Sequence, residues 1–219
     1  MKAEIVAGSK VKAIEGHSIP HLLEEGEVGA VLELTLRNKE GVVVNHVEKK
    51  AESFVQQFLQ MLWIQMNQVW ENIANINVKD TGNTDRAIHA SNSMFASDAA
   101  SGDVTFGIIV GTGTNAVTIA DYKLQTPVAH GSGAGQLQYS AMTFGAPASD
   151  ATTSQFTLTR NFANASGGTI TVTEVGLYVK GYKYSNTYYF MTLRDVIGGG
   201  IAVPNGQTLT VNYRIQAVI

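Results

Sequence analysis

The sequence predicts a mainly β protein, in which a C-terminal antiparallel β-sandwich is preceded by an N-terminal arm, a β-hairpin and one amphipathic helix. Two observations carry this prediction. Short segments of alternating apolar and polar residues recur through the second half, with glycine-rich or asparagine-rich turns between them, as in a sandwich or barrel. A single segment around residue 60 has the three- and four-residue apolar spacing of a helix, which alternating strands do not show.

The N-terminal part of the chain supplies the arm and the hairpin. Residues 1–30 mix short β-like pieces with an acidic cluster, which is typical of an extended arm. Residues 31–37 then alternate strongly, residues 38–41 have the composition of a turn, and residues 42–44 lead back as a run of valines. Two such runs joined by a short turn containing glycine predict a β-hairpin.

The helix is predicted from about Lys49 to Glu71, with Glu48 and Glu52 near the positive end of its dipole. No charged residue lies between Glu52 and Glu71, and glutamines fill most of the non-apolar positions. Because buried glutamine is costly in lipid, we expect no membrane span. A helix apolar over more than half its circumference packs against more than one neighbour, either within its own fold or, as we favour, between subunits. The candidate oligomer-interface residues are Phe54, Phe58, Leu62, Trp63, Met66 and Trp70.

A polar connector rich in Asn, Asp, Thr and Ser spans residues 72–101 and places a domain boundary near residue 100. We therefore expect an assembly region over residues 1–100 and a β-sandwich domain over residues 101–219. The strands of the sandwich are predicted at residues 105–110, 156–160, 169–179, 188–193 and 208–215.

The net charge of the chain argues against one class of function, and charged residues are scarce in its second half. The whole chain has a net charge of −3, which argues against a protein that binds nucleic acid by neutralising phosphates. Residues 96–219 contain only six acidic and six basic residues. Since a lone soluble domain usually keeps a charged surface, we expect partner proteins to cover much of this one. The alternative is a polar but uncharged β surface exposed to water.

No motif predicts an enzyme, a cofactor or a metal, and the absence of cysteine excludes disulfides and thiolate sites. The segment Gly111–Ala116 superficially matches a dinucleotide-binding loop, but the β-branched residues that follow are unsuited to the required helix, so we predict a turn. His17 and His21 could hold a metal with Glu24 or Glu25, although Pro20 opposes a helix there and a surface loop is the default. The N-terminus lacks the apolar core of a secretory signal, so we expect assembly in a cytosol.

Two groups of side chains in the second half remain as candidate sites. Tyr182, Tyr184 and Tyr188 could stack on a glycan, although aromatic cross-strand pairs are the commoner reason for such a cluster. Glu174 and Arg194 interrupt otherwise apolar strands. We predict that these two form a structural ion pair across neighbouring strands, since buried charges are usually paired.

The second half also resembles a domain of tailed-bacteriophage structural proteins. The matching pieces keep the order and rough spacing of that domain over about residues 104–216, and all are structural in character. They are Gly107–Thr114 (GIIVGTGT), Asp121–Leu124 (DYKL), Ile170–Tyr178 (ITVTEVGLY), Thr192–Val196 (TLRDV) and Val203–Val211 (VPNGQTLTV).

The resemblance implies a non-enzymatic virion protein, assembled in the bacterial host cytoplasm and packed against copies of itself and other virion proteins. It favours a tail-associated position (baseplate, adaptor or fibre anchor) over a capsid-surface or decoration protein. No cofactor, nucleic acid or membrane is expected. The rival hypothesis is a glycan- or receptor-binding module that meets the host through the tyrosine-rich hairpin.

Overall fold

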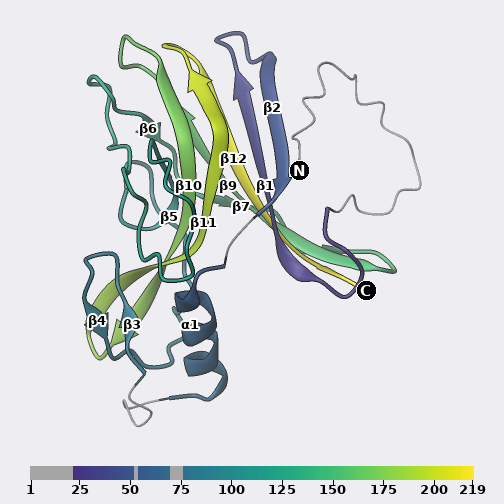
Figure 1. Cartoon of the computed structure of the whole chain (residues 1–219), viewed down its shortest axis with the longest axis vertical. Coiled ribbons are helices and arrows are strands. Elements are labelled where there is room, and N and C mark those ends of the chain that lie inside the picture. The colour runs from purple at the N-terminus through teal and green to yellow at the C-terminus, as the bar shows by residue number, and fades with distance from the viewer. Residues whose placement is uncertain (1–21, 52–53, 70–75) are drawn as a thin grey trace.

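The structure is a computed structural model that describes residues 22–51, 54–69 and 76–219. Two antiparallel β-sheets lie face to face, and one helix and a small two-stranded ribbon lie at one end of the molecule (Figure 1). The predicted mainly β sandwich is confirmed.

The large sheet has the strand order β2-β1-β12-β9-β6, and β7 and β8 also pair with β9. Its long strands are β1 (Val28–Arg37), β2 (Val43–Lys50), β9 (Thr153–Ala163) and β12 (Thr208–Val218). The short strands β6 (Gln138–Tyr139), β7 (Thr143–Phe144) and β8 (Ala148–Ser149) follow one another along β9. The edge of the large sheet beyond β9 is therefore covered, whereas β2 forms the opposite edge.

The small sheet has the order β11-β10-β5 and consists of β5 (Gly107–Gly111), β10 (Ile170–Lys183) and β11 (Asn186–Val203). The long hairpin of β10 and β11 extends past the sandwich to the end of the molecule where the ribbon and helix lie (Figure 1). The ribbon pairs β3 (Val78–Lys79) with β4 (Asp85–Arg86).

The core lies between the sheets and follows from the alternation of the strands. Leu32, Leu34 and Leu36 on β1 are buried, and their partners on β12 are Tyr213, Val211 and Leu209, which are buried too. Such a face excludes water along its whole length, and its apolar area is the main source of stability. Polar contacts join the sheets as well, since the Tyr213 hydroxyl donates to Asp195 Oδ2 on β11 at 2.9 Å.

The N-terminal hairpin belongs to the sandwich and does not form a separate region. Strand β1 pairs with the last strand, β12, from Val28 opposite Ala217 to Arg37 opposite Thr208. The boundary expected near residue 100 thus divides residues that share one sheet, because β12 needs a neighbour on each side to satisfy its backbone groups.

Helix α1 (Gln56–Met66) is shorter than predicted, because Lys49 and Lys50 belong to strand β2. Glu48 is also a strand residue, so the predicted carboxylate at the helix start is wrong for this position, and Glu52 lies outside the described residues. The helix begins without a side-chain cap. Instead, the Val55 amide donates to the Thr192 carbonyl and the Gln56 amide to that of Ile119, which satisfies donors that a helix start leaves open.

The apolar face that the sequence pattern indicates for α1 is not the face that the structure buries. The structure buries Gln57, Met61 and Ile64, whereas the pattern places Phe54, Phe58, Leu62 and Met66 on one face of the helix. The triplet Leu62-Trp63-Ile64 makes the helix apolar more than halfway round, so periodicity alone does not fix its rotation.

Candidate functional site: a buried ion network and an exposed helix face

The structure brings Glu174 and Arg194 together on the neighbouring strands β10 and β11. Both side chains are buried, and Arg194 donates from Nη2 and Nε to Glu174 Oε2, at 2.9 Å and 3.2 Å. The register sets Gly176 directly opposite Arg194, so the pair runs diagonally across the hairpin, which long side chains can span.

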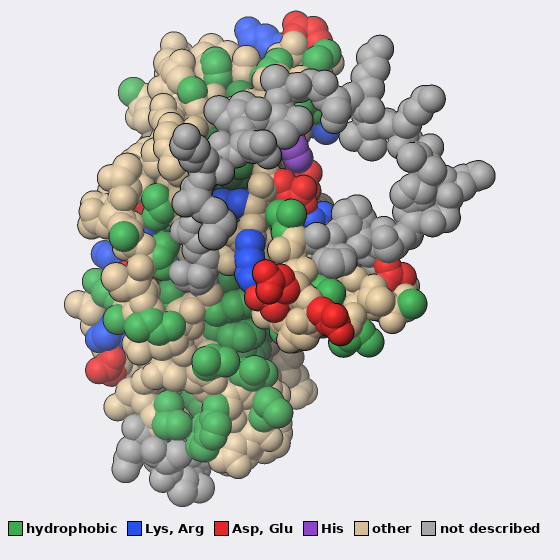
Figure 2. All heavy atoms as spheres, turned by 45° about the vertical axis from the view of Figure 1, so that its right-hand side comes forward, with side chains coloured by type: hydrophobic (Ala, Val, Ile, Leu, Met, Phe, Trp, Pro, Cys, Tyr) green, Lys and Arg blue, Asp and Glu red, His purple; other side chains and the backbone are tan. Residues whose placement is uncertain are grey.

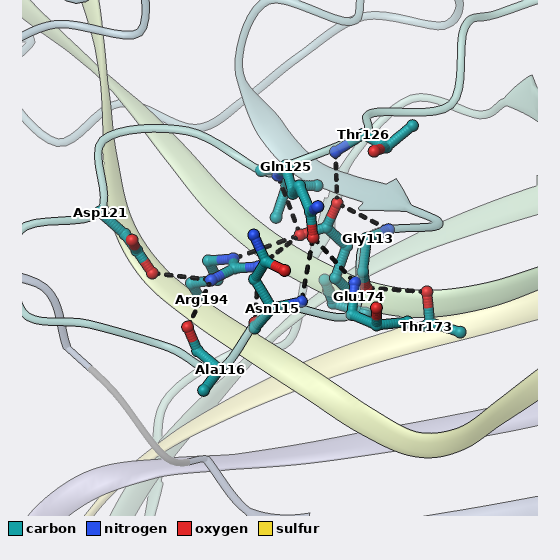
Figure 3. A network of polar contacts seen from close by, with 12 residues as sticks. Gly113, Asn115, Ala116, Asp121, Gln125, Thr126, Thr173, Glu174 and Arg194 are labelled. Carbon is teal, nitrogen blue, oxygen red and sulfur yellow. Dashed lines mark hydrogen bonds and ion pairs between the residues drawn. The ribbon is translucent and has the colours of Figure 1, made fainter.

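Three backbone amides also donate to the Glu174 carboxylate. They come from Gly113, at 3.1 Å, and from Gln125 and Thr126, at 3.0 Å and 2.7 Å (Figure 3). A carboxylate buried this deeply is tolerated only when its lone pairs are filled. Glu174 therefore fixes two loop segments, one after β5 and one around residue 125, to the small sheet.

Glycine is required where these loops approach the carboxylate. A Cβ atom added at Gly111 or at Gly113 would lie 2.5 Å from Glu174 Oε1, which is far inside the van der Waals contact distance. Neither position has a left-handed φ, so close approach explains these glycines and backbone conformation does not.

Asp121 completes the network from its open side. Asp121 Oδ2 accepts a 2.7 Å hydrogen bond from Arg194 Nη1 and another from the Thr118 amide. Asp121 Oδ1 accepts from the Thr118 hydroxyl. Partial burial opposes ionisation of Asp121, but the Thr118 amide and the Arg194 guanidinium outweigh it and lower the pKa of this carboxyl. The remaining Arg194 donors reach the carbonyls of Asn115 and Ala116.

Four of the five segments on which the expected family resemblance depends thus converge on one network. Gly113, Asp121, Glu174 and Arg194 each come from a different matching piece, and they meet in space (Figure 3). A further contact joins two of these pieces, since the Leu124 amide donates to the Tyr178 hydroxyl oxygen at 2.6 Å. These motifs therefore hold the fold together.

The loop after β5 does not bind dinucleotide in the manner that its glycine pattern superficially suggests. No helix follows it, and its amides are used by the protein, since those of Thr114 and Asn115 both donate to Gln125 Oε1 at 2.9 Å. Phosphate binding needs such amides to be open. Residues 112–118 form an irregular loop, and neither Gly111 nor Gly113 has a left-handed φ, so the predicted turn is wrong.

A second buried cation, Arg160 on β9, was not predicted. It is fully buried, and its guanidinium donates only to carbonyls, those of Ser140, Phe106, Ile108, Ala100 and Asp103. It also lies over the Tyr139 ring, 4.9 Å from its centroid. The sequence does hold one indication that Arg160 is buried. Arg160 is two residues from both Leu158 and Phe162, which face inward, so the alternation of the strand places its side chain on the same face.

A shallow pocket of about 330 Å³ adjoins the network and is lined by Asn115, Asp121, Lys123, Gln125 and Arg194, among others. The polar groups of Asp121 and Arg194 there already bond to each other. Within the described ranges no group of three His, Cys, Asp or Glu could hold a metal. His17 and His21, the pair weighed as metal ligands, lie outside those ranges.

An exposed apolar face on α1 is the most distinctive surface feature. Leu59, Trp63 and Met66 project from it with side chains 63%, 42% and 77% exposed, and the spacing of four and three residues places them on one side of the helix. We call these three residues the Trp63 face. Hydrophobic side chains gather at this end of the molecule in Figure 2, and residues 54–69 carry no charge.

The predicted interface residues divide between this face and the fold itself. Trp63 and Met66 are exposed and Leu62 is half-buried beside them. Phe54 and Phe58 are half-buried, with their rings tilted against each other and the ring centroids 4.2 Å apart, and Phe54 packs against the core. Leu59 was missed by the sequence analysis, and Trp70 lies outside the described residues.

The three candidate glycan-stacking tyrosines do not share a surface. On the β10–β11 hairpin Tyr182 is opposite Thr187 and Tyr188 is opposite Gly181, which puts Tyr182 and Tyr188 on different faces of the ribbon. Tyr184 is exposed at the turn, and Tyr188 lies beneath the Arg86 guanidinium. None of the three is directly opposite another tyrosine, so they form no cross-strand aromatic pairs either.

Comparisons with protein-family models, with curated proteins and with solved structures find no match. Among the described residues, no helix has the length and apolar character needed to span a membrane.

Proposed function

We propose that this chain is a non-enzymatic structural component of a tailed-phage virion that works by symmetric protein–protein contacts. The observation that carries the proposal is the convergence of its phage-like motifs on the Glu174–Arg194 network. Because the donors and acceptors of that network bind one another, its residues serve the architecture of the fold.

The Trp63 face supports assembly as the mode of action. A cluster of exposed leucine, tryptophan and methionine is unusual on a monomer and typical of an interaction site. Under point-group symmetry each copy uses the same surface, so that one modest apolar contact is repeated around a ring. Within the particle we propose a tail-associated position (baseplate, adaptor or fibre anchor) ahead of a capsid-surface or decoration position.

The test is the composition of the particle. Phage particles would be purified by density gradient from a host that produces this chain, and their proteins quantified by mass spectrometry. We expect the chain at several copies per particle, and antibody labelling in electron micrographs would then separate tail from capsid. Its absence from intact particles would overturn the proposal.

A further inference from the structure

The four sheet edges of the sandwich differ in whether other backbone segments bond to them. Strands β6, β7 and β8 cover β9, and a bridge between Gly111 and Pro127 covers β5. On β11, the Val55 amide donates to Thr192 and the Thr81 amide to Tyr189. Strand β2 has β1 on one side and, among the described residues, no strand on the other.

The backbone groups that β2 directs outward can be identified from the ladder. The Ala51 amide donates to the Ala30 carbonyl, and hydrogen-bonded pairs alternate along an antiparallel ladder. Asn45, Val47 and Lys49 therefore direct their backbone groups toward β1. His46, Glu48 and Lys50 direct theirs away from the sheet, and no described residue bonds to those groups.

The first part of this edge lacks the charged residues and prolines that usually prevent strands from pairing, although the register of its ladder to β1 shifts at Val43. Val42, Val43 and Val44 are exposed at its start, and residues 42–47 contain no Asp, Glu, Lys, Arg or Pro. Natural edges are usually blocked by such residues. Three charged residues follow, Glu48, Lys49 and Lys50, and they pair with Arg214, Asp195 and Glu27 in that order.

We propose that β2 pairs antiparallel with β2 of a second copy, so that two large sheets become one continuous sheet across a two-fold axis. This inference rests on the proposed structural function and adds the contact surface and its partner. The register is centred on Val47, because that register sets His46 of one copy opposite Glu48 of the other. Moving the centre to Glu48 would put the two carboxylates opposite each other, which is unfavourable.

The absence of cysteine makes the register testable with a single introduced thiol. In the proposed pairing Val47 meets Val47 as a non-hydrogen-bonded pair, with Cα atoms about 4.5 Å apart, a separation that a disulfide spans. The matched control is Val44→Cys. Val44 is three residues from the centre and is therefore roughly 20 Å from its counterpart at about 3.4 Å per residue.

We expect the full chain with Val47→Cys to form a disulfide dimer under mild oxidation at least tenfold faster than Val44→Cys. Random collision predicts the reverse order, because Val44 is the more exposed side chain. Adding His46→Pro to Val47→Cys removes an outward amide while sparing the ladder to β1, and should slow cross-linking at least tenfold with circular dichroism unchanged.

Equal or faster cross-linking of Val44→Cys, or no effect of His46→Pro in a folded protein, would overturn the edge pairing. Neither result would touch the proposed function, which depends on the presence of the chain in particles. Conversely, if the chain is absent from particles but its Val47→Cys variant still cross-links, the virion proposal is wrong and the edge pairing still holds.

Discussion

Glu174 holds two loop segments, one after β5 and one around residue 125, against the small sheet. Replacing it with Gln keeps its volume but leaves Arg194 buried with Asp121 as its remaining anion. Breaking a buried pair from one side costs about 3–5 kcal/mol. We therefore expect Glu174→Gln to lower the free energy of unfolding by that amount in urea titrations. The double-mutant cycle with Arg194→Met should give a coupling energy above about 1 kcal/mol. A coupling energy of zero would show that the two side chains do not stabilise each other.

Gly113 gives a second test at this scale, with a matched control in the same chain. In Gly113→Ala the new methyl group would collide with Glu174 Oε1 and with Gln125 Cβ, both 2.5 Å away. Overpacking of this kind costs about 1–3 kcal/mol. Gly168→Ala meets nothing within 4 Å and should change stability by less than about 0.5 kcal/mol. Equal thermal midpoints for the two variants would contradict the close-approach explanation.

The lowered pKa of Asp121 predicts how the free energy of unfolding depends on pH. Its pKa is lowered in the folded state, so its contribution is present above the unfolded value of about 3.9 and is lost as the pH falls through the folded one. Asp121→Asn should thus destabilise the protein at neutral pH, and the difference from wild type should shrink below about pH 4. Urea titrations at several pH values measure this, and a difference that stays constant down to pH 2 would exclude the mechanism.

At the scale of elements, α1 has one buried face and one exposed apolar face, the proposed assembly surface. Replacing Leu59 and Met66 with Gln should leave thermal stability nearly unchanged, because both side chains are exposed, and should weaken self-association by at least tenfold in sedimentation experiments. Met61→Ala, on the buried face, should instead cost about 2–5 kcal/mol. A double variant that assembles like wild type would show that the Trp63 face is not a contact.

Local pattern predicted elements well and their partners poorly. The alternation of residues 31–37 and the glycine turn after them were enough to predict the hairpin. The few charges on otherwise apolar strands, Glu174 on one and Arg194 with Asp195 on another, were enough to suggest the Glu174–Arg194 pair. The rotation of α1 could not be obtained, because Trp63 and Ile64 are both apolar and only tertiary packing decides which is buried. Asp121 and Gln125 lie in loops without periodicity, so their place in the site depends on contacts distant in sequence.

At the scale of the whole molecule, the shared large sheet predicts that the second half is not an independent domain. The fragment 101–219 would lack β1, and the Leu209, Val211 and Tyr213 layer would lose the leucines packed beside it. We expect this fragment to lack a cooperative thermal transition and to bind a hydrophobic dye, while the full chain unfolds cooperatively. A fragment with native-like near-ultraviolet dichroism would restore the boundary near residue 100.

The pairing of β1 with β12 also sets the order of events during synthesis. The register joins residues about 180 positions apart, such as Leu32 and Tyr213, and contacts this distant form slowly. A ribosome must therefore release residues 208–218 before the leucine-lined strand near the start can find its neighbour. Until then the nascent chain exposes that strand, so a pause late in translation would prolong its exposure to chaperones and to aggregation.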